Sequence, residues 1–324
     1  MITIRNAFDR YLEMISLSRS ENTYIAYSKA IKVFSSVMEG QGIDPDKFEI
    51  KSINEDLIGK MATYLKQFSA ATEQLYLIAV KGFYQYLLAE ELASINLQRL
   101  QMLIKSRSRR LGQRLPQFPK ENIEKVIEYA SDFVNLSYES EKDQLINFRD
   151  AAFIITLADT GMRVHEMCNL RRGDLDWNEF KALIIGKGDS QAIVRFSSRS
   201  FRSIKSYLSL RSSNDGKSGK PLPTLPIFSR HDKGAGEKIL SISPSTGRNI
   251  INRRVKEILG ENHAGTITPH SFRHYFVTNV LIGSGGNLKL AQELARHKNI
   301  QVTQRYAHLN DDELDKGYHK IFEE

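Results

Sequence analysis

The sequence is poor in cysteine and has no long apolar run, and each scarcity excludes a class of protein. Of 324 residues only Cys168 is a cysteine, so the chain forms neither an internal disulfide nor a cysteine-based zinc site. No apolar run approaches the roughly 20 residues that a membrane helix needs, and no charged segment followed by an apolar one resembles a secretory signal. We therefore expect a protein of the reducing cytoplasm that has no membrane partner.

Acidic residues are missing from one short segment, and most of the excess positive charge lies there. The chain carries 46 basic and 38 acidic residues, a net charge of +8. Residues 105–120 hold six basic residues and no acidic one, whereas residues 1–104 have a net charge of −1 and residues 121–324 of +3. Such a segment is typical either of a solvated linker or of a strap that binds a polyanion such as nucleic acid. Charge alone does not separate these two interpretations.

Helical periodicity dominates the residues before this basic segment. The Ser-x-x-Glu spacing from Ser18 to Glu21 predicts a helix start, because it has the form of a capping box, and apolar residues follow at helical intervals. Further helices are expected after Asn54 and from Ser69 onward. We therefore predict a small helical bundle over residues 1–104.

The residues after the basic segment combine helices with one short β element. Residues 105–120 contain a glycine and two prolines, and we place a domain boundary there, near Gly112. Two apolar, β-rich arms around Gly186–Asp189 predict a hairpin, and residues 212–223 are expected to form a surface loop. The predicted fold class is mainly α, with a small β-hairpin in the second domain (α+β), residues 121–324.

Two segments of this second block hold basic residues in unusual settings. Arg163 stands at a predicted helix start with Glu166 one turn further on, a spacing that by itself favours a surface ion pair. Lys187 lies between two glycines at the hairpin turn, where a lysine by itself favours solubility. Neither segment indicates a function when it is taken alone.

The second block also contains all eight histidines of the chain. Pro269 opens a predicted helix, and His270 and Arg273 fall in its first turn. Free backbone amides and the positive end of the helix dipole attract anions to such a place. His297 and Tyr306 follow, nine residues apart.

A zinc site is the alternative interpretation of the histidines. His270 and His274 have the i,i+4 spacing of two zinc ligands, but Ser271 stands where a zinc-protease helix has glutamate. No cluster of cysteines or carboxylates in the sequence supplies the remaining ligands. We expect neither a metal nor another cofactor.

Together these residues are the groups that phosphoryl transfer without a metal requires. Guanidinium groups bind the non-bridging oxygens of a phosphate, a cationic acid protonates a leaving alkoxide, and a phenol attacks. Their order and context resemble the tyrosine recombinases, also called phage-type integrases. The resemblance rests on Thr160-Gly161-Met162-Arg163 with Glu166 and Leu170, on Gly186-Lys187-Gly188, on His270 to Arg273, and on His297, Thr303, Arg305 and Tyr306.

The resemblance implies a role for each matched residue. Tyr306 would attack a scissile DNA phosphate and leave a 3′-phosphotyrosyl link and a free 5′-hydroxyl. Arg163 and Arg273 would bind that phosphate, and Lys187 would protonate the departing 5′ oxygen.

Three further roles follow from the same resemblance. His270 would assist proton transfer from Tyr306, His297 would donate to a phosphate oxygen, and Glu166 would orient neighbouring cationic or imidazole groups. One residue departs from the family pattern, since Arg296 stands before His297 where the family usually has glycine.

The resemblance also implies an organisation and partners. Residues 1–104 would be a helical core-binding domain, residues 105–120 a basic linker, and residues 121–324 a catalytic domain whose tail helix links protomers into a tetramer on double-stranded DNA. We see no arm-binding domain before the helical block, which favours simple two-domain recombinases of the Xer type. Two alternatives remain, a catalytically silent DNA-binding regulator and a type IB-like topoisomerase. The basic residues expected to contact DNA are Lys105, Arg107, Arg109, Arg110 and Arg114.

Overall fold

The computed structural model describes residues 2–109, 119–185, 191–236 and 238–307 of the chain. It divides into two compact units, Met1–Gln113 and Arg114–Glu324. Each unit has a hydrophobic core of its own, as independently folding domains do. Among the described helices none is long and apolar enough to cross a membrane.

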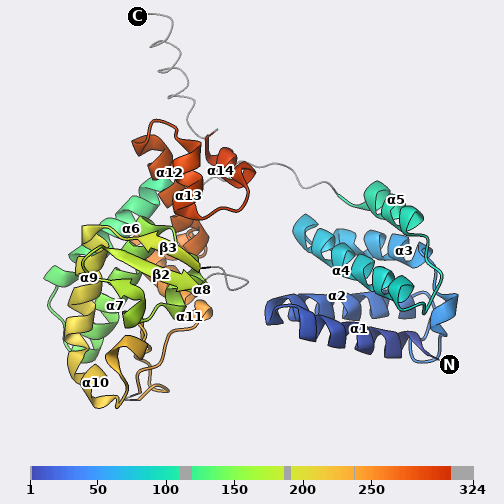
Figure 1. The fold of residues 1–324 in the computed structure, drawn as a ribbon, viewed down its shortest axis with the longest axis horizontal. Helices are drawn as coiled ribbons and strands as arrows, with labels where there is room; N and C mark the ends of the chain where they lie inside the picture. The colour runs from blue at the N-terminus through green and yellow to red at the C-terminus, as the bar shows by residue number, and fades with distance from the viewer. Residues whose placement is uncertain (1, 110–118, 186–190, 237, 308–324) are drawn as a thin grey trace, which may run out of the picture. The chain divides into compact units, whose positions relative to one another are not determined.

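The first unit is a helical bundle (Figure 1). Aromatic rings contribute to its buried core. The helices are α1 (Ile4–Ser18), α2 (Glu21–Glu39), α3 (Asp56–Tyr64), α4 (Ala70–Ala89) and α5 (Leu97–Arg107). Phe8 of α1 lies between Phe34 of α2 and Phe83 of α4, at ring-centroid distances of 6.0 and 4.8 Å. Tilted and edge-on contacts of this kind stabilise a core beyond the area that they bury.

Helix α4 begins as predicted, with Ser69 as its N-cap, but the predicted capping box at Ser18 is wrong. Ser18 is the last residue of α1, and its Oγ donates to the Met14 carbonyl at 2.8 Å. The chain is extended at Arg19 and Ser20, so α2 starts with Ser20 as its N-cap. A hydroxyl that bonds back into its own helix is not available to cap the next one.

The first unit also contains helices that the sequence analysis did not anticipate. Helix α1 precedes the first predicted helix, and α5 continues through Arg107, into the basic segment. Helix α5 has Asn96 as its N-cap and two basic side chains in its last turn, where they oppose the negative end of the helix dipole. The basic charge of Lys105 and Arg107 is therefore compatible with a helix end.

The second unit is mainly helical and carries a small antiparallel sheet, which confirms the predicted fold class. Its helices are α6 (Lys120–Asp132), α7 (Glu141–Thr160), α8 (Val164–Asn169), α9 (Ser198–Leu210), α10 (Ser212–Lys217), α11 (Pro244–Leu259), α12 (Pro269–Gly283), α13 (Leu288–Ala295) and α14 (Ile300–Ala307). Helix α7 is buried along most of its length and packs against α6, α9 and α12. The end of α7 is thus fixed on several sides.

The sheet has the strand order β1 (Leu175–Asp176), β2 (Lys181–Ile185), β3 (Gln191–Arg195), all antiparallel (Figure 1). Strands β2 and β3 are the predicted hairpin arms, in a register that pairs Ala182 with Val194. Both of these side chains are buried, and the alternation of buried and exposed residues along β2 is that of a half-covered strand. The predicted Gly186–Asp189 turn lies outside the described residues.

The surface loop expected at residues 212–223 is only partly a loop. Its first half is helix α10, whose Asp215 is buried and accepts from Arg211 Nε at 2.8 Å and from Arg172 Nη1 at 3.0 Å. A buried carboxylate needs such partners, and together they hold this polar segment against the domain. The composition of the segment favours a turn, but the ion pairs of Asp215 stabilise a helix in its first half.

Candidate active site

The site begins where α7 ends. Gly161 terminates the helix in the left-handed conformation, with φ of 57°, which glycine adopts without steric cost. A Cβ at this position would lie 2.4 Å from Cδ1 of Phe276 on α12. Glycine is therefore required at position 161 for two reasons. It allows the turn that precedes Arg163, and it leaves room for the close approach of α12.

Arg163 and Glu166 form a paired unit at the start of α8. Glu166 Oε2 accepts from the Arg163 backbone N–H, and Glu166 Oε1 accepts from Arg163 Nη1, both at 2.9 Å. The Arg163 side chain is 44% exposed, whereas that of Glu166 is 2% exposed. This is not the surface ion pair that the spacing alone favours, since its acidic member is buried and its basic member faces outward.

A second arginine contacts Glu166 from α13. Arg296 Nη2 donates to Glu166 Oε2 at 3.0 Å, so one carboxylate bridges two guanidinium groups. Burial acts to raise the pKa of Glu166, but Arg296 and then Arg163 outweigh it and the pKa is lowered. Glu166 is therefore ionised at neutral pH, and its position between cationic groups fits the orienting role expected for it.

Arg273 links the end of α7 to the end of α13. It is almost fully buried on α12, and it donates to the carbonyls of Gly161 and Ala295. Pro269 is the first residue of α12, which confirms the predicted helix start, and Thr268 and Ser271 cap the helix reciprocally. The guanidinium of Arg273 is thereby held beside the turn that precedes Arg163 and the turn that contains Arg296.

His297 lies directly after the turn that ends α13. Its Nδ1 is 2.9 Å from Thr303 Oγ1 of α14, so the threonine of the terminal motif ties this imidazole to the helix that carries Tyr306. Burial and the positive charges of Arg273 and Arg163, with smaller effects from two neighbouring histidines, lower the pKa of His297 to about 4. Its ring is neutral at neutral pH in the free protein.

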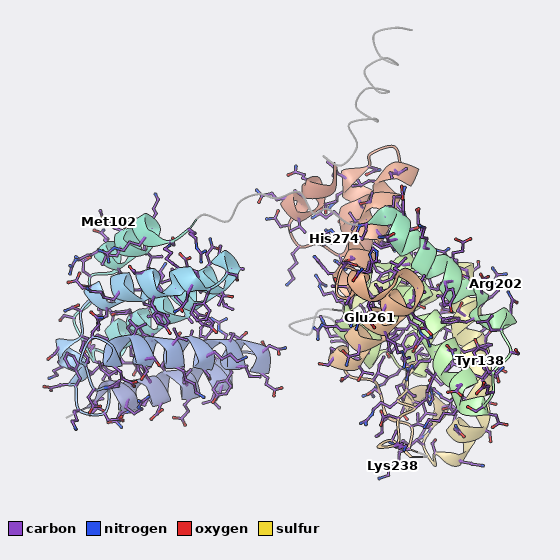
Figure 2. The ribbon with its side chains drawn as sticks, turned by 180° about the vertical axis from the view of Figure 1, so that it is seen from behind. Met102, Tyr138, Arg202, Lys238, Glu261 and His274 are labelled. Atoms are coloured by element: carbon purple, nitrogen blue, oxygen red, sulfur yellow. The ribbon has the colours of Figure 1, made fainter. Side chains whose placement is uncertain are left out.

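His270 lies in the first turn of α12 and is exposed, and the centroid of its ring is 4.3 Å from that of His274, which Figure 2 labels. Burial, then Arg273 and Arg163, lower the pKa of His270. Burial, then His270 and Arg273, lower that of His274 to about 4. Neutral imidazoles in this place can accept protons.

A groove of about 710 Å³ extends from three of these residues to α11. Arg163, His270 and Arg273 line one part of it, and Arg248 and Lys256 of α11 line another. None of the lining residues, all of them described, is acidic. A groove with this charge is complementary to a polyanion.

The sequence analysis missed the α11 side of this groove. Arg248, Asn252 and Lys256 recur every four residues, so they share one face of α11, while Ile251 and Val255 are buried. This amphipathic pattern, with polar residues on one face of the helix and apolar residues on the other, was the sequence signal that could have indicated the α11 side of the groove.

Several predicted site residues cannot be placed with the others. Lys187, Arg110 and Arg114 lie outside the described residues, and Tyr306 is placed only as part of α14. Arg109 is described, and its guanidinium binds Glu73 and the Phe68 carbonyl within the first unit. Among the described residues no group of three histidine, cysteine or acidic side chains gathers as metal ligands would.

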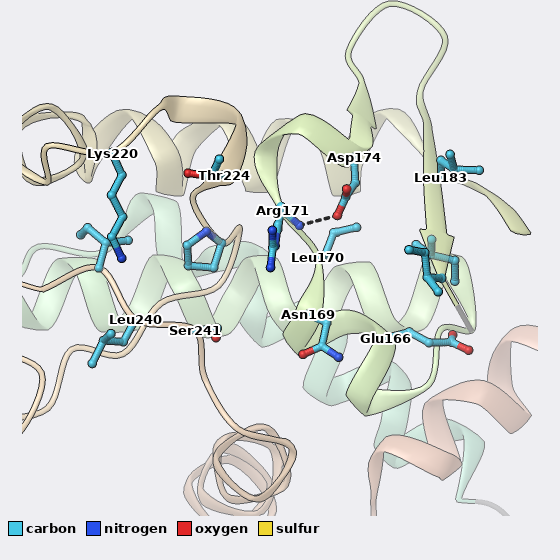
Figure 3. Close-up of a pocket in the computed structure, with 14 residues that line it drawn as sticks. Glu166, Asn169, Leu170, Arg171, Asp174, Leu183, Lys220, Thr224, Leu240 and Ser241 are labelled. Carbon is cyan, nitrogen blue, oxygen red and sulfur yellow. Dashed lines mark hydrogen bonds between the residues drawn. The ribbon is translucent and has the colours of Figure 1, made fainter. Parts of the chain in front are cut away.

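A second pocket, of about 730 Å³, lies between α8, the sheet and residues 220–241. Figure 3 shows Glu166 at one end of it, apart from Arg171 and Asp174, which are joined by a hydrogen bond of 2.7 Å from the Arg171 N–H. This pocket is lined by both acidic and basic groups. It is less suited to a polyanion than the first groove.

Comparisons with known proteins identify the family. The phage integrase family model matches residues 118–313, and the model of the phage integrase N-terminal SAM-like domain matches residues 8–91. The chain belongs to the phage integrase family. The prediction from the motifs is thereby confirmed, and the protein is an enzyme of the tyrosine recombinase class.

A curated relative and two solved structures are similar to the chain over nearly its full length. It is 31% identical over 319 residues to tyrosine recombinase XerC of Bacillus pumilus strain SAFR-032, which covers 96% of this chain and 93% of the relative. The structure of the XerH site-specific recombinase bound to palindromic difH substrate, a post-cleavage complex, has a TM-score of 0.62 at 18% identity, covering 98% and 95% of the two chains. A lambda integrase dimer bound to a COC′ core site has a TM-score of 0.62 at 17% identity, covering 94% and 95%. At these identities the two structures show the shared fold.

Proposed function

We propose that this protein cleaves and rejoins DNA at specific sites, with Tyr306 as the nucleophile and a 3′-phosphotyrosyl link as the intermediate. The observation that carries the proposal is the convergence of Arg163, Arg273, His270 and His297 from distant segments on one place beside a basic groove. Because the covalent link conserves the energy of the phosphodiester bond, rejoining needs no nucleotide cofactor.

Arg163 and Arg273 are proposed to bind the scissile phosphate. Both line the groove, and guanidinium groups match the non-bridging oxygens of a phosphate. Lys187 is proposed to protonate the 5′ oxygen as it leaves. Together they would stabilise the charge that grows in the transition state.

His270 is proposed to accept the proton of Tyr306. A phenol has an ordinary pKa of about 10, so it needs a base or a cationic surrounding to attack at neutral pH. His270 is neutral there, because its pKa is lowered, and it stands exposed at the groove. His297 is proposed to donate to a phosphate oxygen.

The remaining parts of the proposal concern DNA binding and assembly. Residues 1–104 are proposed as the core-binding domain and residues 105–120 as the linker. The basic residues proposed to contact DNA are Lys105, Arg107, Arg109, Arg110 and Arg114. The tail helix at the end of the catalytic domain, residues 121–324, is proposed to link protomers into a tetramer on DNA, as in a cytoplasmic recombinase of the Xer type. Support comes from the charge of the basic segment and from the relatives named XerC.

An adduct assay tests the proposed function. The purified protein is incubated in EDTA with nicked duplexes tiled across the DNA that flanks its own gene, and covalent adducts are resolved on a denaturing gel. We expect an adduct that Tyr306→Phe abolishes and that Tyr275→Phe retains, since Tyr275 packs against the core. Salt-sensitive binding of a fragment without an adduct would instead support the silent DNA-binding alternative.

A further inference from the structure

Arg296 occupies a backbone position that disfavours its side chain. It ends α13 in the left-handed region, with φ of 57°, a conformation that is unfavourable for a residue with a Cβ and that glycine adopts without steric cost. Three described non-glycine residues have positive φ. The other two, Glu91 and Phe180, are exposed, so Arg296 alone of these three combines this strain with a place at the active site.

The side chain of Arg296 adds a second local cost. It is only 12% exposed, and within the described part of the chain its Nε and Nη1 are buried without a hydrogen-bond partner. Buried donors without partners destabilise a folded chain. Two unfavourable features at one residue beside a reaction centre indicate a function in the reaction rather than in folding.

The contact that Arg296 does make concerns Glu166. That buried carboxylate binds Arg163 by two hydrogen bonds and Arg296 by one. Without Arg296, Glu166 and Arg163 would form a closed pair with a net charge of zero. With Arg296 the three side chains carry a net charge of +1, which is complementary to a phosphodiester.

We propose that Arg296 is a positioning residue for the phosphate site: it shares the Glu166 carboxylate with Arg163 and so restores the positive charge that Glu166 would otherwise cancel. This inference rests on the proposed function, in which Arg163 binds the scissile phosphate. Arg296 acts through Glu166 and Arg163, and it transfers no proton and forms no bond to DNA.

Single-turnover cleavage of a nicked duplex tests this role. Arg296→Gly removes the guanidinium and relieves the backbone strain, so we expect a melting temperature no lower than that of the wild type and unchanged DNA binding. Cleavage should be slower by about 10- to 100-fold, the usual effect of removing a group that orients a functional side chain. Arg296→Lys keeps the charge and should stay within a few-fold of the wild type.

The second variant separates charge from structure. Adding Glu166→Gln to Arg296→Gly returns the net charge of the cluster to +1, so the double variant should regain most of the lost rate. Wild-type cleavage by Arg296→Gly, or a double variant as slow as Arg296→Gly, would overturn the proposal.

A titration that involves no cleavage keeps the two proposals distinguishable. The ring signals of His270 and His297 are followed by NMR while inorganic phosphate is added. We expect weaker binding by Arg296→Gly and recovery in the double variant. Equal phosphate affinity in all three proteins would overturn the role of Arg296, whereas phosphate binding without any adduct in the wild type would overturn the proposed function alone.

Discussion

The two units of this protein each contain a buried glutamate held by two basic residues, and the two clusters differ in how completely their groups are satisfied. In the first unit Glu73 Oε1 accepts from Lys66 Nζ and from the Arg109 backbone N–H, both at 2.8 Å, and Arg109 Nε donates to Oε2. Lys66 and Arg109 are 41% and 38% exposed. The cations of this cluster keep contact with water while they neutralise the buried carboxylate.

In the cluster around Glu166 in the second unit, one of the two cations is buried and not fully hydrogen-bonded. One of its cations, Arg296, is buried, strained at the backbone and left with two unpartnered donors among the described residues. The other, Arg163, is directed to a basic groove. The same charge pattern can therefore either fasten a chain segment or prepare a site for an anion, and the unsatisfied donors distinguish the two clusters.

The largest effect on stability is expected from Glu166→Ala. It leaves Arg296 as a buried charge without a counter-ion, and breaking a buried pair in this way costs about 3–5 kcal/mol. The loss is measured by denaturant unfolding of the full chain, followed by the fluorescence of Trp177, the single tryptophan, which lies in the second unit.

A matched control accompanies this prediction. In the double variant Glu166→Ala/Arg296→Gly neither buried charge of this cluster remains, so most of the stability should return. If the double variant were as unstable as Glu166→Ala, the burial of Arg296 would not be the cause of the loss.

Glu73→Ala is expected to have a smaller effect, because Lys66 and Arg109 can turn to water. The loss of hydrogen bonds to a charged group costs about 1.5–3 kcal/mol, confined to the first unit. Far-ultraviolet circular dichroism should show an earlier transition for that unit while the Trp177 transition stays unchanged. A shift of the Trp177 transition would show that the two clusters are not independent.

The histidines of the second unit are expected to have the smallest effect on stability at neutral pH, because they change stability only in acid. The pKa values of His274 and His297 are lowered from 6.5 to about 4, so between these pH values the unfolded chain binds protons that the folded chain does not. Their contribution to stability is therefore fully present above pH 6.5 and is lost as the pH falls to 4. His297→Asn should flatten the pH dependence of the Trp177 transition, and an unchanged slope would refute this assignment.

Sequence patterns predicted the parts of the fold that depend on local chemistry. The helix start near Ser69, the Pro269 helix start and the β2–β3 hairpin arms are short-range signals, and the structure contains all three. The box at Ser18 failed because a serine hydroxyl can bond back into its own helix instead. Local spacing does not reveal which of these two bonds the folded chain forms.

The site was predictable as a set of residues but not as a geometry. The motifs named Arg163, Arg273 and His297, but no spacing indicates that Arg273 bonds to the carbonyls of Gly161 and Ala295. The pairing of Arg296 with Glu166 joins positions 130 residues apart. Such contacts depend on tertiary packing, which only the folded structure shows.

The most direct test of the proposed chemistry is to identify the residue that carries the DNA. The covalent adduct formed on a nicked duplex is digested with protease and nuclease, and the modified peptide is sequenced by mass spectrometry. The proposed chemistry predicts a nucleotide linked through its 3′-phosphate to Tyr306. A nucleotide on any other residue, or a link through a 5′-phosphate, would contradict it.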